Sequence, residues 1–599
     1  YTYAMSAASD VYKRQTMKNI IKLLSICLVY GVCSCSDLTF GDKFLGSQPE
    51  SSGAVLDSMF SSKINADKVL TSAYTYLPYG LPTGAAPNNK LGVNLLEAIS
   101  DLYQSFRNNA SDGPTNLYYN GLLSANNSLA NAEAYRYGSE SQYNAIRYAW
   151  IYIENVAKVP DMTEDERNER IAEAKMIIAL SYAEMFRYVG GVCWIDHSIE
   201  PNETMEFPRL TFAETADKIV GLLNEAIPYL KWKQDEIEDG RMTKAGAMGL
   251  KLRILLFAAS PTFNSDTKWH SQADEYTCYG NYSKKRWEDA MKAGQEFFAE
   301  LDRRQEYALT QPAEPTAQAR RLAYRAGYYD RGGTEVLVSI RRGYNESTHN
   351  NLFDQRFYSG PTLNYVNMFP WADGEDFPEN FNWEHPSKQP FFENGEPTRD
   401  PRLYENVAVP GDRYFNDTQA PVYTNHQDYR AEGSGFLMMK FILQAASDRQ
   451  NRPVQWPYLR LPEVLLSYAE AINEVEGPEN ALSYVNQVRN RVGLSDLPSD
   501  IGQSDLREAI LRERALEFGF EEVRWFDLVR WGRKDDFRKK LYGLYSKGDK
   551  VNNPTSFTFA PYELTLRYWA NNWDSKWYMA PIPQKEINKG YGMTQNPGW

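Results

Sequence analysis

Apolar residues recur at intervals of three and four along much of this chain, which is the spacing of amphipathic helices. Two such runs begin with a capping box, in which a threonine precedes a glutamate by three residues: Thr163 with Glu166, and Thr211 with Glu214. The spacing predicts a helix after each box. It predicts further helices over 54–77, 141–158, 243–259, 284–302 and 505–519.

The clearest pair of predicted helices lies between residues 462 and 492. Pro462 and Pro478 occupy first-turn positions, and Gly493 follows the second helix as a carboxy-terminal cap. This helix-turn-helix has about the 34-residue length of a tetratricopeptide repeat. We therefore predict a mostly α fold with a tetratricopeptide-like helical-repeat scaffold, in which the other helix pairs have looser connections.

Three segments, 79–140, 303–455 and 545–599, are rich in Gly, Pro, Asn, Asp and Tyr, and we expect long irregular loops there. They contain short strand-like pieces such as EVLVSI at 335–340. Loops of this length are usually functional or disordered, and their many aromatic residues favour order. No charged block or low-complexity linker divides the chain, so we expect a single domain with an irregular, aromatic-rich surface.

An apolar run near the start has the layout of a secretory signal. Leu23 to Val32 is apolar, Lys18 and Lys22 precede it, and small residues follow it. The run is too short to span a membrane comfortably, because a spanning helix needs about 20 apolar residues. We expect residues 17–34 to be a signal peptide, and residues 1–16 to be upstream or adapter-derived sequence.

The end of this run resembles the lipobox of bacterial lipoproteins. In Val32-Cys33-Ser34-Cys35, an aliphatic residue lies three places before the second cysteine and a small residue immediately before it. We therefore expect Cys35 to be the acylated first residue of the mature protein, held on a membrane by its acyl chains. The alternative is a plain cleaved signal with incidental cysteines.

Composition and charge then exclude several classes of function. The chain has 42% hydrophobic and 24% charged residues, which is ordinary for a globular protein. Its net charge of -13 argues against nucleic acid as a partner. Beyond the amino-terminal segment only Cys193 and Cys278 remain, so we expect no disulfide framework and no thiolate metal site. Whether these two cysteines pair stays open.

Catalytic motifs are sparse. The five histidines show no paired spacing, and the GxSxG and phosphate-loop motifs do not occur. Glu513 with Glu517 fits an ion-paired or solvated helix face better than a glycosidase pair, which needs one raised pKa in a cleft. We expect Arg514, Arg524 and Arg530 to bind carboxylates within the scaffold. We therefore predict that the chain is not an enzyme.

Several long motifs follow one another along the chain. The clearest is YLRLPEVLLSYAEAINEVEGPENALSYVNQVRNRVGL at 458–494, followed by LREAILRERALEFGFEEVRWFDLVRWGR at 506–533. The others are at 172–195 (AEAKMIIALSYAEMFRYVGGVCWI), 240–260, 361–377 (PTLNYVNMFPWADGEDF), 399–407 (RDPRLYENV) and 578–599. In this order the motifs resemble the SusD/RagB family of outer-membrane nutrient-binding lipoproteins, and the resemblance covers essentially the whole chain after Cys35.

The resemblance implies one SusD-like domain over 35–599, with an amino-terminal portion at about 35–260 and a carboxy-terminal portion at about 300–599. It also implies a lipid-anchored place on the outer membrane, at the surface of a Bacteroidetes-type cell. Members of the family act with a SusC-like TonB-dependent transporter and capture glycans or, in some cases, peptides. No cofactor or metal is predicted, although a structural calcium ion stays possible.

Sugar recognition needs flat rings for stacking and polar groups that bind hydroxyls, and Tyr, Trp, Asn, Asp and Arg supply them. Tyrosines outnumber phenylalanines here, 41 to 27, and many fall in the loops. The segment 97–113 resembles the loop in which family members place ligand contacts. The candidate ligand-binding residues are Asp101, Tyr103, Arg107, Asn108, Tyr344, Asn345, Phe357 and Trp371. We expect Trp150, Tyr468, Trp525 and Trp531 in the core instead.

The sequence therefore predicts a lipoprotein that binds an oligosaccharide and delivers it to a transporter without cleaving it. Three alternatives stay open. The first is a peptide-binding member of the same family, and the second is an anchored helical glycoside hydrolase with two carboxylates about 5 to 9.5 Å apart in one cleft. The third is a tetratricopeptide scaffold that binds only proteins, in its concave groove.

Overall fold

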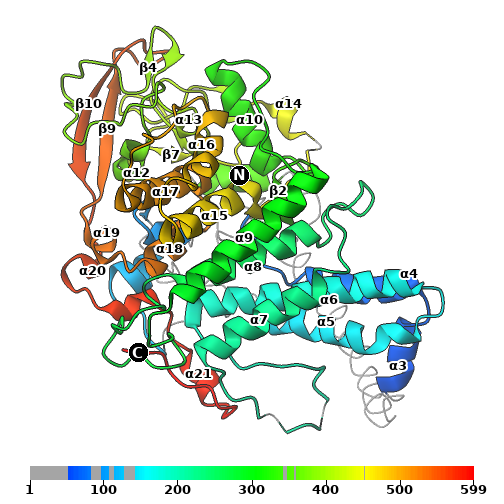
Figure 1. Ribbon diagram of the computed structural model, residues 1–599. Coiled ribbons are helices and arrows are strands. Elements are labelled where there is room, and N and C mark those ends of the chain that lie inside the picture. Colours follow the sequence, from blue (N-terminus) through cyan, green and yellow to red (C-terminus); the bar gives the residue numbers. More distant parts are fainter. Residues whose placement is uncertain are drawn as a thin grey trace, which may run out of the picture. The chain divides into compact units, whose positions relative to one another are not determined.

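Figure 1 shows the chain as a computed structural model. Its described residues are 52–81, 96–106, 114–126, 142–200, 202–204, 206–341, 347–355, 359–450 and 452–599. The chain divides into two compact units. Of the described residues, the smaller contains 52–67 with Asn155–Met162, and the larger contains those within Lys68–Glu154 and Thr163–Trp599. The single domain over 35–599 stays a prediction.

The helix predicted over 54–77 is interrupted. α3 (Ser52–Met59) ends before a break at 60–62, and α4 (Lys63–Tyr74) begins after it. The Ser62 hydroxyl accepts a hydrogen bond from the amide of Asn65 (3.4 Å), and this side chain therefore caps a new helix. Apolar spacing continues across the break, which is why the sequence pattern predicted one helix and not two.

The larger unit is built from helices that pack in chain order (Figure 1). α6 packs on α7, α7 on α8, α8 on α9, α9 on α15, and α15 on α16 and α17. Both capping boxes are present, and the helix pairs confirm the mostly α, tetratricopeptide-like scaffold. The bounds are α5 (Gln142–Asn155), α6 (Glu164–Val189), α7 (Phe212–Ala226), α8 (Lys244–Ala259), α9 (Lys284–Arg304), α15 (Leu461–Val475), α16 (Leu482–Arg491), α17 (Gln503–Phe518) and α18 (Arg524–Arg530).

Close helix contact depends on small residues. Gly294 of α9 faces the ring of Tyr468 on α15, and a Cβ atom at this position would lie 2.2 Å from that ring. Glycine therefore lets the two helices approach closely. Of the four aromatic residues predicted in the core, Tyr468 and Trp525 are buried, and Trp150 and Trp531 are half-buried.

Strands are short and occur in antiparallel pairs. In the part of the chain that the structure describes, each sheet has two strands. The strand predicted at 335–340 is β2 (Val336–Ile340), which pairs with β8 (Trp456–Arg460). The longest pair is the hairpin of β9 (Tyr542–Gly548) and β10 (Phe557–Glu563). The other pairs are β1 (Tyr103–Ser105) with β3 (Ser359–Pro361), β4 (Phe392–Glu393) with β5 (Glu396–Pro397), and β6 (Val407–Ala408) with β7 (Leu437–Met438).

The segment 303–455, predicted to be irregular, contains helices that the apolar spacing missed. α10 (Ala317–Tyr329) is capped at its start by Thr316, whose hydroxyl accepts a hydrogen bond from the amide of Ala319 (3.2 Å). The buried face of α10 carries Arg321 and Arg325 among tyrosines, so the spacing of apolar residues does not predict this helix. The remaining helices are α11 (Ser347–Gln355), α12 (Leu363–Met368), α13 (Leu403–Asn406), α14 (Ala446–Arg449), α19 (Lys534–Arg538), α20 (Tyr568–Asn571), α21 (Gln584–Ile587) and the short turns η1 (Leu96–Ile99), η2 (Pro114–Tyr119), η4 (Val156–Lys158), η5 (Phe415–Asp417) and η6 (Ser575–Tyr578).

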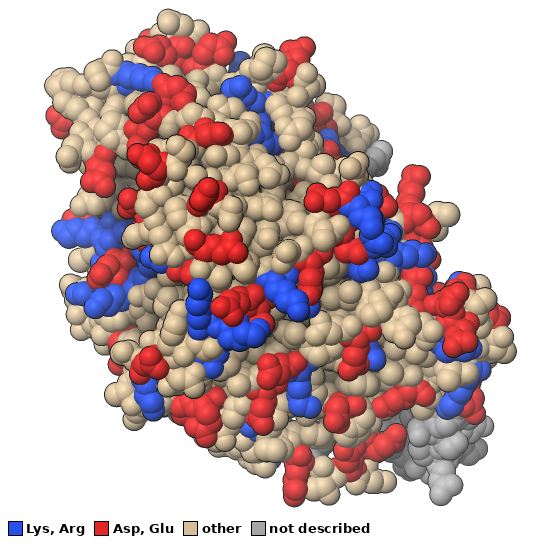
Figure 2. Space-filling model, in the orientation of Figure 1, with Lys and Arg blue, Asp and Glu red and all other residues tan. Residues whose placement is uncertain are grey.

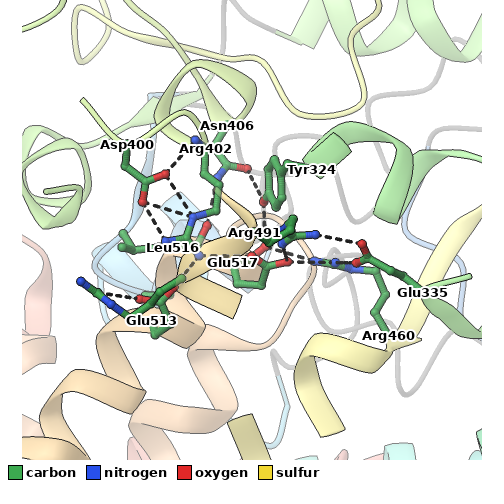
Figure 3. A network of polar contacts seen from close by, with 12 residues as sticks. Tyr324, Glu335, Asp400, Arg402, Asn406, Arg460, Arg491, Glu513, Leu516 and Glu517 are labelled. Carbon is green, nitrogen blue, oxygen red and sulfur yellow. Dashed lines mark hydrogen bonds and ion pairs between the residues drawn. The ribbon is translucent and has the colours of Figure 1, made fainter. Parts of the chain in front are cut away.

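A network of buried charges centres on Glu517 of α17 (Figure 3). Its carboxylate contacts the guanidinium groups of Arg491 (2.6 Å), Arg460 (3.1 Å) and Arg402 (3.2 Å). All four side chains are at most 1% exposed. Burial alone would raise the pKa of Glu517, but the three positive charges outweigh it and hold that pKa well below its usual value.

The network is balanced in charge. Arg402 also pairs with Asp400 (2.7 Å) and Glu513 (2.6 Å). The ion pairing predicted for Glu513 and Glu517 is confirmed, although both lie inside the protein and not on a solvated face. Ion pairs connect five carboxylates, Glu335, Asp400, Glu513, Glu517 and Glu521, to five basic groups, Arg402, Lys440, Arg460, Arg489 and Arg491.

The internal partners predicted for three other arginines are also confirmed. Arg514 and Arg530 share the carboxylate of Asp527, at 2.7 and 2.9 Å. Arg524 pairs with Asp101 (2.9 Å). These contacts tie α17 and α18 to each other and to the segment after η1, so much of the carboxy-terminal half is joined by ion pairs.

Glu97 of η1 is also buried, but its pKa is raised where that of Glu517 is lowered. It accepts hydrogen bonds from the amide of Phe520 and the hydroxyl of Ser100, both at 3.2 Å. Burial and the nearby Glu522 carboxylate raise the pKa of Glu97 to about 8. Glu97 is therefore largely protonated in the folded protein near neutral pH.

Replacing Glu517 by glutamine removes the charge that three buried arginines share. We expect Glu517→Gln to lower the free energy of unfolding by about 3 to 5 kcal/mol, the typical cost of breaking a buried ion pair from one side. Denaturant unfolding followed by circular dichroism measures this change. The matched control is Glu479→Gln at an exposed position, which should be nearly neutral. An unfolding midpoint unchanged by Glu517→Gln would contradict the central role of this carboxylate.

The raised pKa of Glu97 makes its contribution to stability depend on pH. The folded state binds the proton more tightly than the unfolded chain, so the contribution is full below the unfolded pKa of 4.5 and is lost as pH rises through about 8. Each unit of difference in pKa corresponds to roughly 1.4 kcal/mol. Glu97→Gln keeps the neutral form at every pH. We expect the wild type to lose stability relative to this variant between pH 5 and 8, as measured by denaturant unfolding. A constant difference across that range would refute the assignment.

Candidate functional site

Two segments that carry predicted ligand-binding residues meet in one antiparallel ribbon. β1 pairs with β3 so that Tyr103 lies opposite Pro361 and Ser105 opposite Ser359. Residues after β1 and residues before β3 therefore leave the ribbon at the same end. Arg107, Asn108, Tyr344, Asn345 and Phe357, as well as Cys35, lie outside the described residues.

Asp101 holds the start of the ribbon in place. It is 1% exposed, and its carboxylate contacts Arg524 Nε and Nη2 (both 2.9 Å) and Lys539 Nζ (2.7 Å). Burial alone would raise the pKa of Asp101, but these two positive charges hold it well below its usual value. In this structure Asp101 serves as an internal anchor, and its contact with a ligand stays a prediction.

Tyr103 is buried as well, with 2% of its surface exposed. Its hydroxyl accepts a hydrogen bond from the Ser359 hydroxyl (3.0 Å), across the ribbon. The edge of its ring packs against Phe520, with 5.3 Å between ring centroids. Tyr103 therefore links the two strands to the core below them, and its role as a stacking surface stays a prediction.

Arg567 is a residue of the site that sequence reasoning missed. Its guanidinium group is buried and donates hydrogen bonds to the backbone carbonyls of Ser100 (2.5 Å) and Tyr103 (2.6 Å) and to the Gln104 side chain (3.0 Å). No motif near residue 567 indicates this role, because the contacts span more than 460 positions of the chain. With Asp101, Arg567 makes the base of the ribbon rigid.

Trp371 lies in a separate aromatic cluster. It is 7% exposed, its ring contacts Phe377 (5.1 Å between centroids), and the Lys388 ammonium group lies 4.2 Å from its centroid. The cluster continues through Phe381, Trp383 and Phe391 to Phe559 of β10. Trp371 is a packing residue here, and its stacking on a ligand stays a prediction.

A small hollow with both polar and apolar walls adjoins the end of the ribbon. Its volume is about 20 Å³, which is room for one water molecule or hydroxyl group and not for a sugar ring. Ser359 lines it, together with residues of the loop from Asp428 to Glu432. In this loop Asp428, Arg430 and Glu432 are exposed. Because β3 also contacts β7, this loop is held beside the ribbon.

Tyr429 gives the hollow an available hydroxyl group. Among the described residues, this buried hydroxyl has no hydrogen-bond partner. Burial, and to a smaller extent Tyr545, raises the pKa of Tyr429 to about 12, so the phenol is neutral at physiological pH. The hollow therefore offers carboxylates, a guanidinium group and a neutral phenol within one loop, which together can donate to and accept from hydroxyl groups.

A larger cavity, of about 440 Å³, has different chemistry. Its walls are mostly aliphatic and aromatic, so it suits an apolar group better than a molecule rich in hydroxyls. Cys193 lines it, and both Cys193 and Cys278 are buried and unpaired. Burial raises the pKa of Cys193 to about 11, which keeps this thiol protonated. The wall residues include Met185, Val189, Val192, Ile195, Ile199, Phe207, Ile582 and Met593.

The described residues contain neither a clustered set of metal ligands nor a helix suited to span a membrane. In the ranges given above, no group of three or more His, Cys, Asp or Glu side chains is arranged to hold a metal ion. Within the same part of the chain, no helix combines the length and the apolar composition that crossing a membrane requires.

Comparison with known sequences gives a family match in the carboxy-terminal half. Residues 337–599 match the model of the SusD family. SusD-like protein P2 of Formosa agariphila is 32% identical over 151 residues, which are 24% of this chain and 25% of that protein. Matches to this and two further SusD-like proteins of the same organism span 17 to 42% of the length of those relatives.

Solved structures extend the match to the fold of nearly the whole chain. A SusD-like protein from Bacteroides fragilis superposes with a TM-score of 0.69 at 23% identity, over 91% of this chain and 98% of that one. A SusD-like carbohydrate binding protein from Bacteroides fragilis gives a TM-score of 0.65 at 21% identity, over 89% of this chain and 99% of that one. These likenesses establish the fold, and together with the match of residues 337–599 to the SusD family they support the resemblance found in the motifs.

Proposed function

We propose that this protein binds a nutrient glycan at the end of the β1–β3 ribbon and delivers it to a SusC-like TonB-dependent transporter. One observation carries the proposal. The β1–β3 ribbon ends at Ser105 and Ser359, beside a hollow whose side chains can hydrogen-bond hydroxyl groups. One structural neighbour is described as a carbohydrate binding protein, which supports the same class of ligand.

The base of the ribbon supports binding because it is already ordered. Asp101 is held by two basic groups, and Arg567 fixes the backbone on either side of it. A rigid base reduces the conformational entropy that a ligand must remove on binding. Specificity would then come from the residues that continue from the end of the ribbon.

We propose that the glycan is bound and not cleaved. A glycosidase needs a carboxyl group of raised pKa that reaches the substrate from a cleft. Glu97 has the raised pKa but is 0% exposed. Glu513 and Glu517 lie in buried ion pairs. These carboxyl groups therefore do not form an acid and base pair for an external substrate.

Location would follow from the amino-terminal segment. Acylation of Cys35 would hold the protein at the outer membrane, on the cell surface, where a transporter partner diffuses in the same plane. Two or three acyl chains bind a membrane far more stably than one. Confinement to a surface raises the effective concentration of the two partners, so a weak contact is sufficient for transfer.

Binding is tested with the full chain in detergent on an array of neutral and acidic polysaccharides. We expect Asp428→Ala combined with Arg430→Ala to weaken binding of the selected glycan about thirtyfold, because two hydrogen-bonding groups contribute roughly 1 kcal/mol each. Calorimetry measures the affinity. The matched control removes the exposed ion pair of α9, with Lys285→Ala and Asp289→Ala, and should change nothing.

Three results would contradict the proposal in different ways. Unchanged affinity in the Asp428 and Arg430 variant would move the site away from the hollow. Binding of peptides and of no glycan would assign the protein to the peptide-binding class. Turnover of the bound glycan, detected as new reducing ends, would make it an enzyme.

A further inference from the structure

The β9–β10 hairpin has one buried face and one solvent face. Leu544 and Phe559 are buried on the first face, where they lie on alternate residues of each strand. On the other face, Tyr545 of β9 lies opposite Ala560 of β10, and both are exposed. Lys547 and Thr558 form the next pair on this face, also exposed. An aromatic residue therefore stands among small and polar residues on the solvent side.

Tyr545 stacks on Tyr562 across the two strands. The ring centroids are 4.0 Å apart and the ring planes differ by 19°. Tyr545 is 41% exposed, while Tyr562 is half-buried and donates a hydrogen bond from its hydroxyl to the carbonyl of Gly433. The stack therefore has an anchored inner ring and an accessible outer ring.

Glycine at position 543 makes room for the inner ring. Gly543 lies opposite Tyr562, and a Cβ atom at 543 would be 2.5 Å from Cζ of that ring and 2.7 Å from the carbonyl oxygen of Ser434. No side chain larger than hydrogen fits there without moving the ring. The stack of Tyr545 on Tyr562, called the platform below, is therefore formed by the hairpin itself and requires no ligand.

The platform borders the hollow at the ribbon. The Tyr562 hydroxyl donates a hydrogen bond to the carbonyl of Gly433, and Gly433 is one of the residues that line the hollow. Tyr429 also lines the hollow, and its hydroxyl lacks a hydrogen-bond partner among the described residues. An exposed ring with a neighbouring unsatisfied hydroxyl matches the two needs of a sugar: an apolar surface for its C–H face and a polar group for its hydroxyls.

Charge favours a neutral ligand over an anionic one. The loop beside the platform carries the carboxylates of Asp428 and Glu432, and the chain as a whole has a net charge of -13. On the face shown in Figure 2, lysine and arginine side chains are interspersed with aspartate and glutamate and do not form one large basic area. A polyanionic glycan would therefore meet repulsion at the loop.

We propose that the solvent face of the β9–β10 hairpin is a stacking subsite for one pyranose ring of a neutral glycan. Tyr545 contacts the C–H face of that ring, and Tyr429 hydrogen-bonds a hydroxyl group at its edge. This subsite rests on the proposed function, since it extends the glycan site from the hollow along the hairpin. A glycan that spans both places contacts the ribbon and the platform at the same time.

The test compares Tyr545→Ala with Tyr542→Ala in the full chain. Tyr542 is on the same strand and is 36% exposed, but it points to the opposite face, which makes it a matched control. The probes are laminarin and pullulan, two neutral glucans, and alginate, a polyanion. We expect wild-type protein to bind a neutral glucan, Tyr545→Ala to weaken this binding at least about tenfold, and Tyr542→Ala to leave it unchanged. Tyr545→Phe keeps the ring and should keep the affinity within about twofold.

Thermal unfolding of the same variants separates binding from folding. Cross-strand aromatic pairs also stabilise hairpins. If Tyr545→Ala lowers the unfolding temperature but binds the glucan as the wild type does, the stack is structural and the subsite is refuted while the proposed function stands. Preference of the wild type for alginate would refute the neutral class of ligand. If the wild type binds none of the glycans on the wider array, the proposed function fails and the subsite fails with it.

Discussion

Compensation of buried charge is the constraint on which the larger unit depends. An isolated guanidinium group inside a protein is very unfavourable, and three of them surround the Glu517 carboxylate. The arrangement is tolerable because five carboxylates and five basic groups are connected without excess of either sign. The partners come from α16, α17, β8, the segments before β2 and α13, and the segments after β7 and α17. Each of these parts must therefore reach its place for the charges to cancel. Such a core is specific to one arrangement of the chain.

The same principle fixes the candidate site. Asp101 enters the interior with its charge compensated by Arg524 and Lys539, and this places β1 against the carboxy-terminal helices. Asp101 and Arg567, which hold the ribbon, therefore lie inside the protein. The hairpin repeats this division, with Phe559 packed beneath and Tyr545 outside. Both parts of the proposed site thus combine an ordered interior with a chemically varied exterior.

Sequence patterns predicted the scaffold well and the contacts poorly. The capping boxes at Thr163 and Thr211, the helix pair after Pro462 and the strand at 335–340 follow from local chemistry, and all are present. Apolar spacing did not predict α10, because the buried face of this helix carries arginines, which the pattern counts as exposed residues. The type of a polar residue does not show whether it is buried. Asp101 has the chemistry of a sugar contact, but it is buried by partners more than 400 positions away in the chain. The stack of Tyr545 on Tyr562 likewise depends on strand register, which no local pattern in the sequence specified.

The hydrogen bonds from Arg567 to the backbone of the ribbon affect which side chains can change during evolution. Its guanidinium group holds main-chain oxygens of Ser100 and Tyr103, which every amino acid possesses. Replacement of those side chains during evolution leaves both hydrogen bonds intact. Point substitutions near the ribbon can therefore change the side chains that are presented there, while the backbone of the ribbon keeps its geometry.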